Sequence, residues 1–154
     1  MKLVIGCDNA ALELKNVLIS YLEQTKNIEF EDVGILESKQ DTYYPKIAAR
    51  VATIIQKTDN DIEYGILLCG TGIGMALTAN KFKGIRAAVC HDIYSAERAK
   101  KSNNTNVITM GARIIGEELA KRLIDMWLDS HFDGGRSAPK VALIEEYEQN
   151  NFMV

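Results

Sequence analysis

Residues 64–74 read Tyr-Gly-Ile-Leu-Leu-Cys-Gly-Thr-Gly-Ile-Gly, and this stretch decides the fold. The apolar run at residues 66–68 is typical of a buried strand, and alternate glycines then turn the chain before a helical pattern begins at Met75. A strand that leads through a glycine turn into a helix creates an anion site, because free backbone N–H groups and the positive end of the helix dipole converge there. We therefore predict that residues 70–74 bind negative charge.

A cysteine lies at the edge of this predicted anion site. Cys69 ends the strand, where the neighbouring N–H groups would stabilise its thiolate. The glycine spacing does not match a nucleotide-binding loop, because a dinucleotide fingerprint needs its third glycine at Met75 and a P-loop needs Gly-Lys-Ser/Thr. A turn without a functional role is the alternative. A nucleophile or base beside an anion site predicts chemistry on a substrate that carries or develops negative charge.

The composition is that of a globular protein with one core. The 154 residues fit a single domain, residues 1–154, and 47% are hydrophobic and 25% charged. A net charge of −3 and a pI near 5.4 argue against nucleic acid as a partner. No apolar run reaches the roughly 18 residues of a membrane span, and the opening strand pattern at residues 2–7 is not that of a signal peptide.

The three cysteines show no pairing pattern, which predicts reduced thiols in a cytoplasmic protein. Cys7 and Cys90 each follow an apolar run, so we expect them to be buried where strands end. With no C-x-x-C motif and only two histidines, the sequence predicts no metal site and no cofactor.

Five apolar runs rich in β-branched residues alternate with helical spacing of apolar residues. The runs lie at residues 3–5, 28–33, 66–68, 87–90 and 107–109, and helical stripes lie at 14–22, 47–55 and 119–127. This alternation predicts the α/β class: a three-layer α/β/α Rossmann-like sandwich with a five-stranded parallel sheet. A C-terminal helix from about residue 138 to 148 has a narrow apolar stripe, and we expect it to pack on a partner subunit.

Ligands of such folds bind at the carboxyl ends of the strands. The residues just past four of the predicted strands are polar, titratable or glycine, and they lie at positions 7–9, 69–71, 91–92 and 111–113. Reactive groups are therefore expected to gather along one edge of the sheet.

Nine short motifs follow one another in the order and spacing of a known family. They are Ile5-Gly6-Cys7-Asp8, Tyr44-Pro45, Leu68 to Met75, Ala79-Asn80-Lys81, Gly84 to Ala88, Tyr94-Ser95-Ala96, Asn106-Val107, Gly111-Ala112-Arg113 and Gly134-Gly135-Arg136. With them the chain resembles, over nearly its whole length, the sugar-phosphate isomerases that include type B ribose-5-phosphate isomerase and the galactose-6-phosphate isomerase subunits. The resemblance implies aldose–ketose isomerisation without metal, in homodimers or dimers of dimers whose active sites lie between subunits.

The resemblance also implies catalytic roles. Cys69 matches the base that moves a proton between adjacent carbons through an enediolate, and general base catalysis contributes about 10²–10⁴-fold. N–H donors would stabilise the enediolate oxygen; they belong to Gly70, Gly72, Ile73 and Gly74. Thr71 would add a hydroxyl, Asp8 would hold substrate hydroxyls or relay a proton, and Asn103 would supply an oxyanion-stabilising amide. Helix caps at Thr71 and Asp8 and a plain loop role for Asn103 are the alternatives.

For the substrate's phosphate the resemblance points to Arg136 and Lys140, with Arg113 completing the clamp from the neighbouring subunit. The family most often has a second arginine at position 140, and lysine keeps the charge but lacks the bidentate fork. Solvated surface charges are the alternative for these cations. Asn9 and Tyr44 would line the pocket, although Tyr44 could instead be a packed aromatic residue.

Two positions depart from the family pattern. Asn9 and Ser102 stand where family members have histidine, and the histidine at the second position is thought to open the sugar ring. Serine cannot act as a base near neutral pH as an imidazole can. The default substrate pair is D-ribose 5-phosphate and D-ribulose 5-phosphate, and for this pair His91 would have to take over ring opening. Alternatively, the substrate needs no ring opener. A tetrose phosphate such as D-erythrulose 4-phosphate meets the second condition, because it cannot close a five- or six-membered ring.

Two further hypotheses follow from the same residues. One is a subunit of a hexose-phosphate isomerase, but such chains often lack the base or the glycine turn, and this chain keeps both. The other is a non-catalytic sugar-phosphate-binding protein, which the missing histidines favour and the intact block from Cys69 to Gly74 disfavours.

Overall fold

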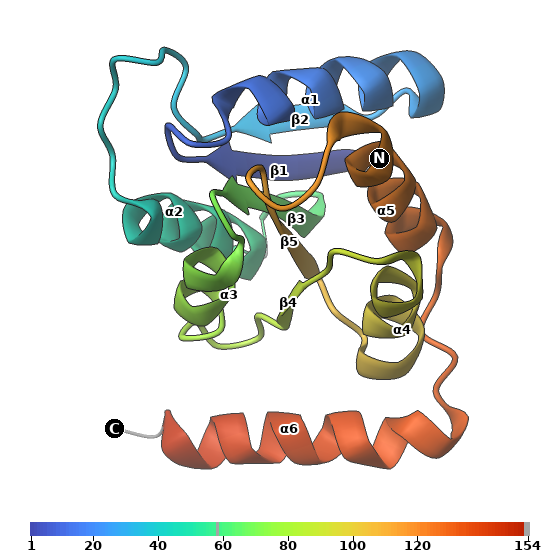
Figure 1. Cartoon of the computed structure of the whole chain (residues 1–154). Helices are drawn as coiled ribbons and strands as arrows, with labels where there is room; N and C mark the ends of the chain where they lie inside the picture. Colours follow the sequence, from blue (N-terminus) through green and yellow to red (C-terminus); the bar gives the residue numbers. More distant parts are fainter. Residues whose placement is uncertain (58, 153–154) are drawn as a thin grey trace.

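A single five-stranded parallel sheet organises the computed structural model, which describes residues 1–57 and 59–152 (Figure 1). The strand order is β2-β1-β3-β5-β4. The strands are β1 (Lys2–Cys7), β2 (Glu29–Asp32), β3 (Ile62–Cys69), β4 (Ala87–Val89) and β5 (Val107–Gly111). The predicted five-stranded parallel sheet is therefore confirmed.

Helices cover both faces of the sheet, as the sandwich prediction requires (Figure 1). One face carries α1 (Leu12–Lys26), α4 (Ile93–Asn103) and α5 (Glu117–Asp129), and the other carries α2 (Tyr44–Gln56) and α3 (Ile73–Ala79). Side chains alternate along β1, so that Leu3 and Ile5 join the first core while Val4 joins the second. In the described part of the chain, no helix combines the length and the apolar character needed to cross a membrane.

The last helix lies apart from these three layers. A short 3-10 turn, η1 (Gly135–Ser137), leads into α6 (Ala138–Asn151), which Figure 1 shows beside the β4 edge of the molecule. Of its side chains only that of Val141 is buried, whereas Leu143, Ile144 and Tyr147 are exposed. The helix runs three residues beyond the predicted end at residue 148.

An ion pair with a buried lysine fixes the chain that leaves β2. Lys15 of α1 is 1% exposed, and its ammonium group contacts the Asp32 carboxylate at 2.5 Å and donates to the carbonyl of Ile35 at 2.6 Å. Charges this deep in a protein are stable only when paired and hydrogen-bonded. The contacts therefore hold residues 32–35 against the carboxyl end of β1. After residue 35 the chain continues to the start of α2.

The strand order places the predicted site at a topological switch point. The chain moves from β1 outward to β2 and then returns to the other side of β1 as β3, so a crevice opens between the carboxyl ends of β1 and β3. The N–H group of Asp8 donates to the carbonyl of Leu68 at 3.3 Å and ties the two ends together. On the far side of β3, the register pairs Cys69 with Gly111 of β5.

Gly111 lies at the closest approach between β5 and the loop after β3. A Cβ atom on Gly111 would lie 2.5 Å from the Cα atom of Thr71 and 2.7 Å from the carbonyl oxygen of Gly70. Only glycine permits this approach of two backbones.

We predict that Gly111→Ala lowers the free energy of unfolding by about 1–3 kcal/mol, because the methyl group meets backbone rather than a movable side chain. Gly116→Ala is the matched control, since a Cβ atom there has no atom within 4 Å and φ is −86°. Its cost, that of alanine at a helix N-cap, is expected to stay below about 1 kcal/mol. Urea denaturation measures both, and equal losses in the two variants would contradict the packing argument.

Candidate active site

The loop after β3 brings the thiol of Cys69 among backbone donors. Cys69 is 5% exposed, and the N–H group of Gly72 donates to its Sγ atom at 3.1 Å. Gly72 has φ +76°, a left-handed conformation that favours glycine, and this turn lets α3 begin at Ile73, two residues before the predicted start. The first N–H groups of α3 have no acceptor within the helix, and this helix begins one residue after Gly72, whose N–H group binds the thiol.

The end of β5 and the turn after it anchor this loop. Three hydrogen bonds link the two segments: the N–H of Ala112 to the carbonyl of Cys69 (2.8 Å), the N–H of Arg113 to the carbonyl of Gly70 (3.0 Å), and the hydroxyl of Thr109 to the carbonyl of Gly72 (2.9 Å). Thr109 is fully buried in β5, and it was not among the site residues predicted from the sequence. A hydroxyl among apolar strand residues was the feature that could have identified it, because a buried hydroxyl needs a partner.

Asp8 and Arg113 both lie near the end of β3 and its loop. Burial raises the pKa of Asp8 above its ordinary value, although the N–H group of Ala10, which donates to its Oδ1 atom at 3.0 Å, and the charge of Arg113 both lower it. The Arg113 side chain packs over Gly70, where a Cβ atom would lie 3.3 Å from its Cδ atom. Arg113 therefore lies beside the Cys69 loop of its own chain, and its role in a phosphate clamp shared with Arg136 and Lys140 of another subunit stays a prediction.

A hollow of about 330 Å³ opens beside Asp8. Its other lining residues are Asn9, Asp41, Thr42, Tyr43, Tyr44 and Pro45. The Tyr44 ring also packs against the loop after β3, because a Cβ atom on Gly74 would lie 2.4 Å from its Cε2 atom. The predicted pocket residues Asn9 and Tyr44 therefore lie next to Asp8, within reach of the Cys69 loop.

The structure does not support helix caps at Thr71 and Asp8. The N-cap of α3 is Gly72, and Thr71 is exposed, with its Oγ1 atom at a long 3.4 Å from the N–H group of Ile73. The N-cap of α1 is Ala11, while Asp8 binds the N–H group of Ala10 in a tight turn. Both side chains therefore lie at the loop without a capping function.

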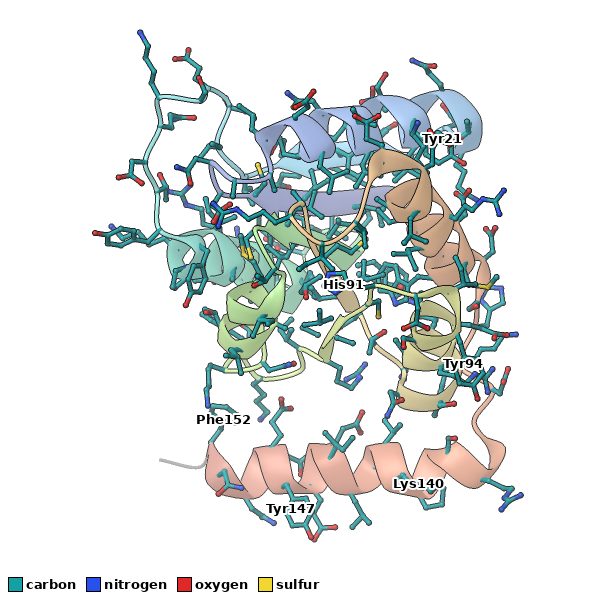
Figure 2. The ribbon with its side chains drawn as sticks, viewed as in Figure 1. Tyr21, His91, Tyr94, Lys140, Tyr147 and Phe152 are labelled. Carbon is teal, nitrogen blue, oxygen red and sulfur yellow. The ribbon has the colours of Figure 1, made fainter. Side chains whose placement is uncertain are left out.

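His91 follows β4 and faces inward (Figure 2). Its Nε2 atom accepts a hydrogen bond from the N–H group of Gly111 at 2.9 Å. Burial lowers the pKa of His91, and the neighbouring Asp92 carboxylate only partly offsets this. The ring is therefore a neutral acceptor whose free electron pair is already occupied.

Three predicted residues do not join the loop within one chain. Asn103 ends α4, and Arg136 and Lys140 lie on η1 and α6; all three are exposed. Figure 2 shows Lys140 on the separate last helix. Asn103 instead lines a hollow of about 550 Å³ between β4 and α6.

Two other features were candidates for a functional site: groups of metal-ligating side chains and the hollows elsewhere on the surface. Among residues 1–57 and 59–152, no group of three or more His, Cys, Asp or Glu side chains is arranged to hold a metal ion. A larger hollow of about 790 Å³ lies at the opposite, amino edge of the sheet, lined by residues such as Tyr64, Arg86 and Asn106, and none of the predicted site residues is among its lining residues.

Comparison with known proteins assigns the family. A family model described as Ribose/Galactose Isomerase matches residues 3–144. The chain belongs to this family. It is 56% identical to a ribose-5-P isomerase B of Listeria innocua, over 98% of this chain and 99% of the relative. It is 51% identical to a D-erythrulose-4-phosphate isomerase of Pectobacterium atrosepticum, over 96% and 95% of the two chains.

Solved structures agree with the assignment. The ribose-5-phosphate isomerase B of Clostridium thermocellum superposes with a TM-score of 0.92 at 36% identity, covering 98% of this chain and 99% of that one. The protein is thus a sugar-phosphate isomerase of the Ribose/Galactose Isomerase family, and the resemblance and the three-layer fold that the sequence predicted are confirmed.

The thiol chemistry of the loop can be tested directly. We predict that iodoacetamide at neutral pH modifies Cys69 before the other two cysteines, because burial raises the pKa of Cys7 to about 11 and that of Cys90 to about 12, so that these thiols stay protonated. Peptide mass spectrometry after brief labelling measures the order, and labelling in urea serves as the control in which all three react. Modification of Cys7 or Cys90 ahead of Cys69 would contradict the prediction.

Proposed function

We propose that the protein isomerises sugar phosphates that react in their open-chain form, with D-erythrulose 4-phosphate and D-erythrose 4-phosphate as its substrate pair. The hydrogen bond between the Gly111 N–H group and Nε2 of His91 carries this proposal. A ring-opening base must accept a proton, and the electron pair of Nε2 is already in use. His131, the other histidine, is exposed between α5 and η1, and the resemblance gives it no role.

The alternative base at the family's ring-opening position is absent as well. Ser102 stands there, near the end of α4, with its Oγ atom 3.5 Å from a guanidinium nitrogen of Arg98. A tetrose phosphorylated at its terminal hydroxyl has no hydroxyl that can close a five- or six-membered ring on its carbonyl. Such a substrate arrives with a free carbonyl and needs no base at position 102.

The proton transfer uses the groups around the loop. The Cys69 thiolate removes a proton from C1 of the ketose, and the electron pair of that C–H bond forms the C1–C2 double bond while the carbonyl oxygen becomes an enediolate oxygen. Backbone N–H groups of residues 70–74 stabilise this oxygen, and one such donor contributes roughly 3 kcal/mol. Asp8, whose pKa is raised, carries a proton from the C1 hydroxyl to the C2 oxygen, and the Cys69 thiol returns its proton to C2.

A second copy of the chain would complete the site. Asn103, Arg136 and Lys140 are exposed and do not join the Cys69 loop within one chain, and α6 leaves Leu143, Ile144 and Tyr147 exposed. Apolar side chains grouped on a projecting helix are typical of a subunit interface. In a homodimer or a dimer of dimers, these residues would reach the loop of the neighbouring subunit and bind the phosphate there.

D-Ribose 5-phosphate is the second candidate substrate. The 56% identical relative of Listeria innocua carries the name ribose-5-P isomerase B, which favours a pentose phosphate. This substrate spends most of its time as a closed ring and requires a base that the loop does not offer. A non-catalytic binding protein is disfavoured because the thiol, the N–H donors and Asp8 are all in place around the loop.

We predict that kcat/KM for D-erythrose 4-phosphate exceeds that for D-ribose 5-phosphate tenfold or more, equal to about 1.4 kcal/mol in transition-state stabilisation. Cys69→Ala should lower kcat by about 10²–10⁴-fold on either sugar, because it removes the base. Cys90→Ala is the matched control for the loss of a buried thiol. Ser102→His should raise turnover of the pentose relative to the tetrose.

Each outcome separates the hypotheses. A preference for ribose 5-phosphate would contradict the open-chain proposal while leaving Cys69 as the base. Full activity in Cys69→Ala would place the base elsewhere, and binding of both sugars without turnover would indicate the non-catalytic alternative.

A further inference from the structure

His91 accepts its recorded hydrogen bond from a backbone N–H group, that of Gly111, and not from a side chain. The ring is half-buried between β4 and α4 and lies near the middle of the molecule (Figure 2). A backbone N–H group can only donate, so the Nε2 atom that accepts from Gly111 carries no proton, and the neutral ring holds its proton on Nδ1.

The residue that His91 binds is the one that touches the Cys69 loop most closely. Gly111 meets the backbone of Thr71 and Gly70 without room for a single added carbon atom. The next two residues, Ala112 and Arg113, donate their N–H groups to the carbonyls of Cys69 and Gly70. A displacement of the Gly111 backbone would therefore move the carbonyl of Cys69 and, with it, the thiol.

We propose that His91 is a positioning residue: by accepting the N–H group of Gly111 it holds the turn of residues 111–113 against the Cys69 loop, and protonation of its ring releases this turn. This inference rests on the proposed role of Cys69 as the base, whereas the hydrogen bond between His91 and Gly111 does not depend on that role. It replaces the ring-opening role that the sequence suggested for His91.

The charged groups near the His91 ring are Asp92 and Arg113. Asp92 is next in the chain, and its carboxylate is engaged by the N–H group and hydroxyl of Ser95 at 2.7 and 2.5 Å. Arg113, on the turn itself, is directed at Gly70 and Asp8. Burial lowers the pKa of His91, which moves protonation of the ring to more acidic pH.

The charged imidazole has two N–H groups and no acceptor, so it would face the N–H group of Gly111 with a second donor. Because a buried donor without a partner is costly, the turn leaves its position instead. The loop is therefore ordered above the pKa of His91, and it loosens as the pH falls through that pKa.

The test follows backbone amide resonances during a pH titration of the full-length protein by ¹H–¹⁵N NMR. The amides of Gly111, Ala112 and Gly72 should shift with one midpoint, equal to that of the His91 ring protons. His91→Gln retains an acceptor at the position of Nε2 that does not titrate, so in this variant these amides should not shift with pH. His131→Gln removes the other histidine and should leave the titration unchanged.

Activity gives the second readout. His91→Leu should lower kcat by about 10–100-fold and raise KM by less, because the base is displaced while Arg136 and Lys140, two of the three groups predicted to bind phosphate, lie outside the released turn. His91→Gln should keep kcat within about threefold of wild type, a rescue that a purely space-filling role would not give. Equal activity of wild type and His91→Leu would overturn the proposal. Amide resonances of the loop that do not shift as His91 titrates would overturn it as well. If the wild type isomerises no sugar phosphate but the amides titrate together, the proposed function fails and the positioning contact stands.

Discussion

The contact between the end of β5 and the loop after β3 is the constraint on which the site depends. Parallel pairing sets Cys69 opposite Gly111, and the bonds from Ala112 and Arg113 continue this pairing past the strand ends. The loop is thereby held where the N–H group of Gly72 donates to the thiol of Cys69. Strong stabilisation of a developing negative charge requires donors fixed in advance, and this contact fixes them.

Much of this arrangement could be predicted from the sequence, because it follows from local patterns. The apolar runs identified all five strands, and the block from Cys69 to Gly74 identified the loop. The boundaries were less accurate: β5 extends to Gly111, and α3 begins at Ile73, since a left-handed glycine permits an immediate turn into the helix. Thr109 was missed because its bond to Gly72 joins segments 37 residues apart in the chain.

Other features could not be predicted because they depend on side-chain direction. Position 91 is polar and follows a strand, which is compatible with a catalytic base, but only the structure shows the ring turned toward the Gly111 backbone. For Arg113, likewise, only the structure shows that its side chain packs over Gly70. The hydrogen bond of His91 bears on the substitution at Ser102 as well. With serine at position 102 and His91 bound to Gly111, neither position offers a free imidazole for ring opening.

Solvent exchange of the substrate tests the central claim, proton transfer by Cys69 on an open-chain sugar phosphate, most directly. D-Erythrulose 4-phosphate is incubated with the enzyme in D₂O, and ¹H NMR follows the loss of one C1 proton. The account predicts exchange at a rate comparable to isomerisation in the wild type, and loss of exchange and isomerisation to the same extent in Cys69→Ala. Exchange that persists in Cys69→Ala would contradict the account, because a different group would then remove the proton.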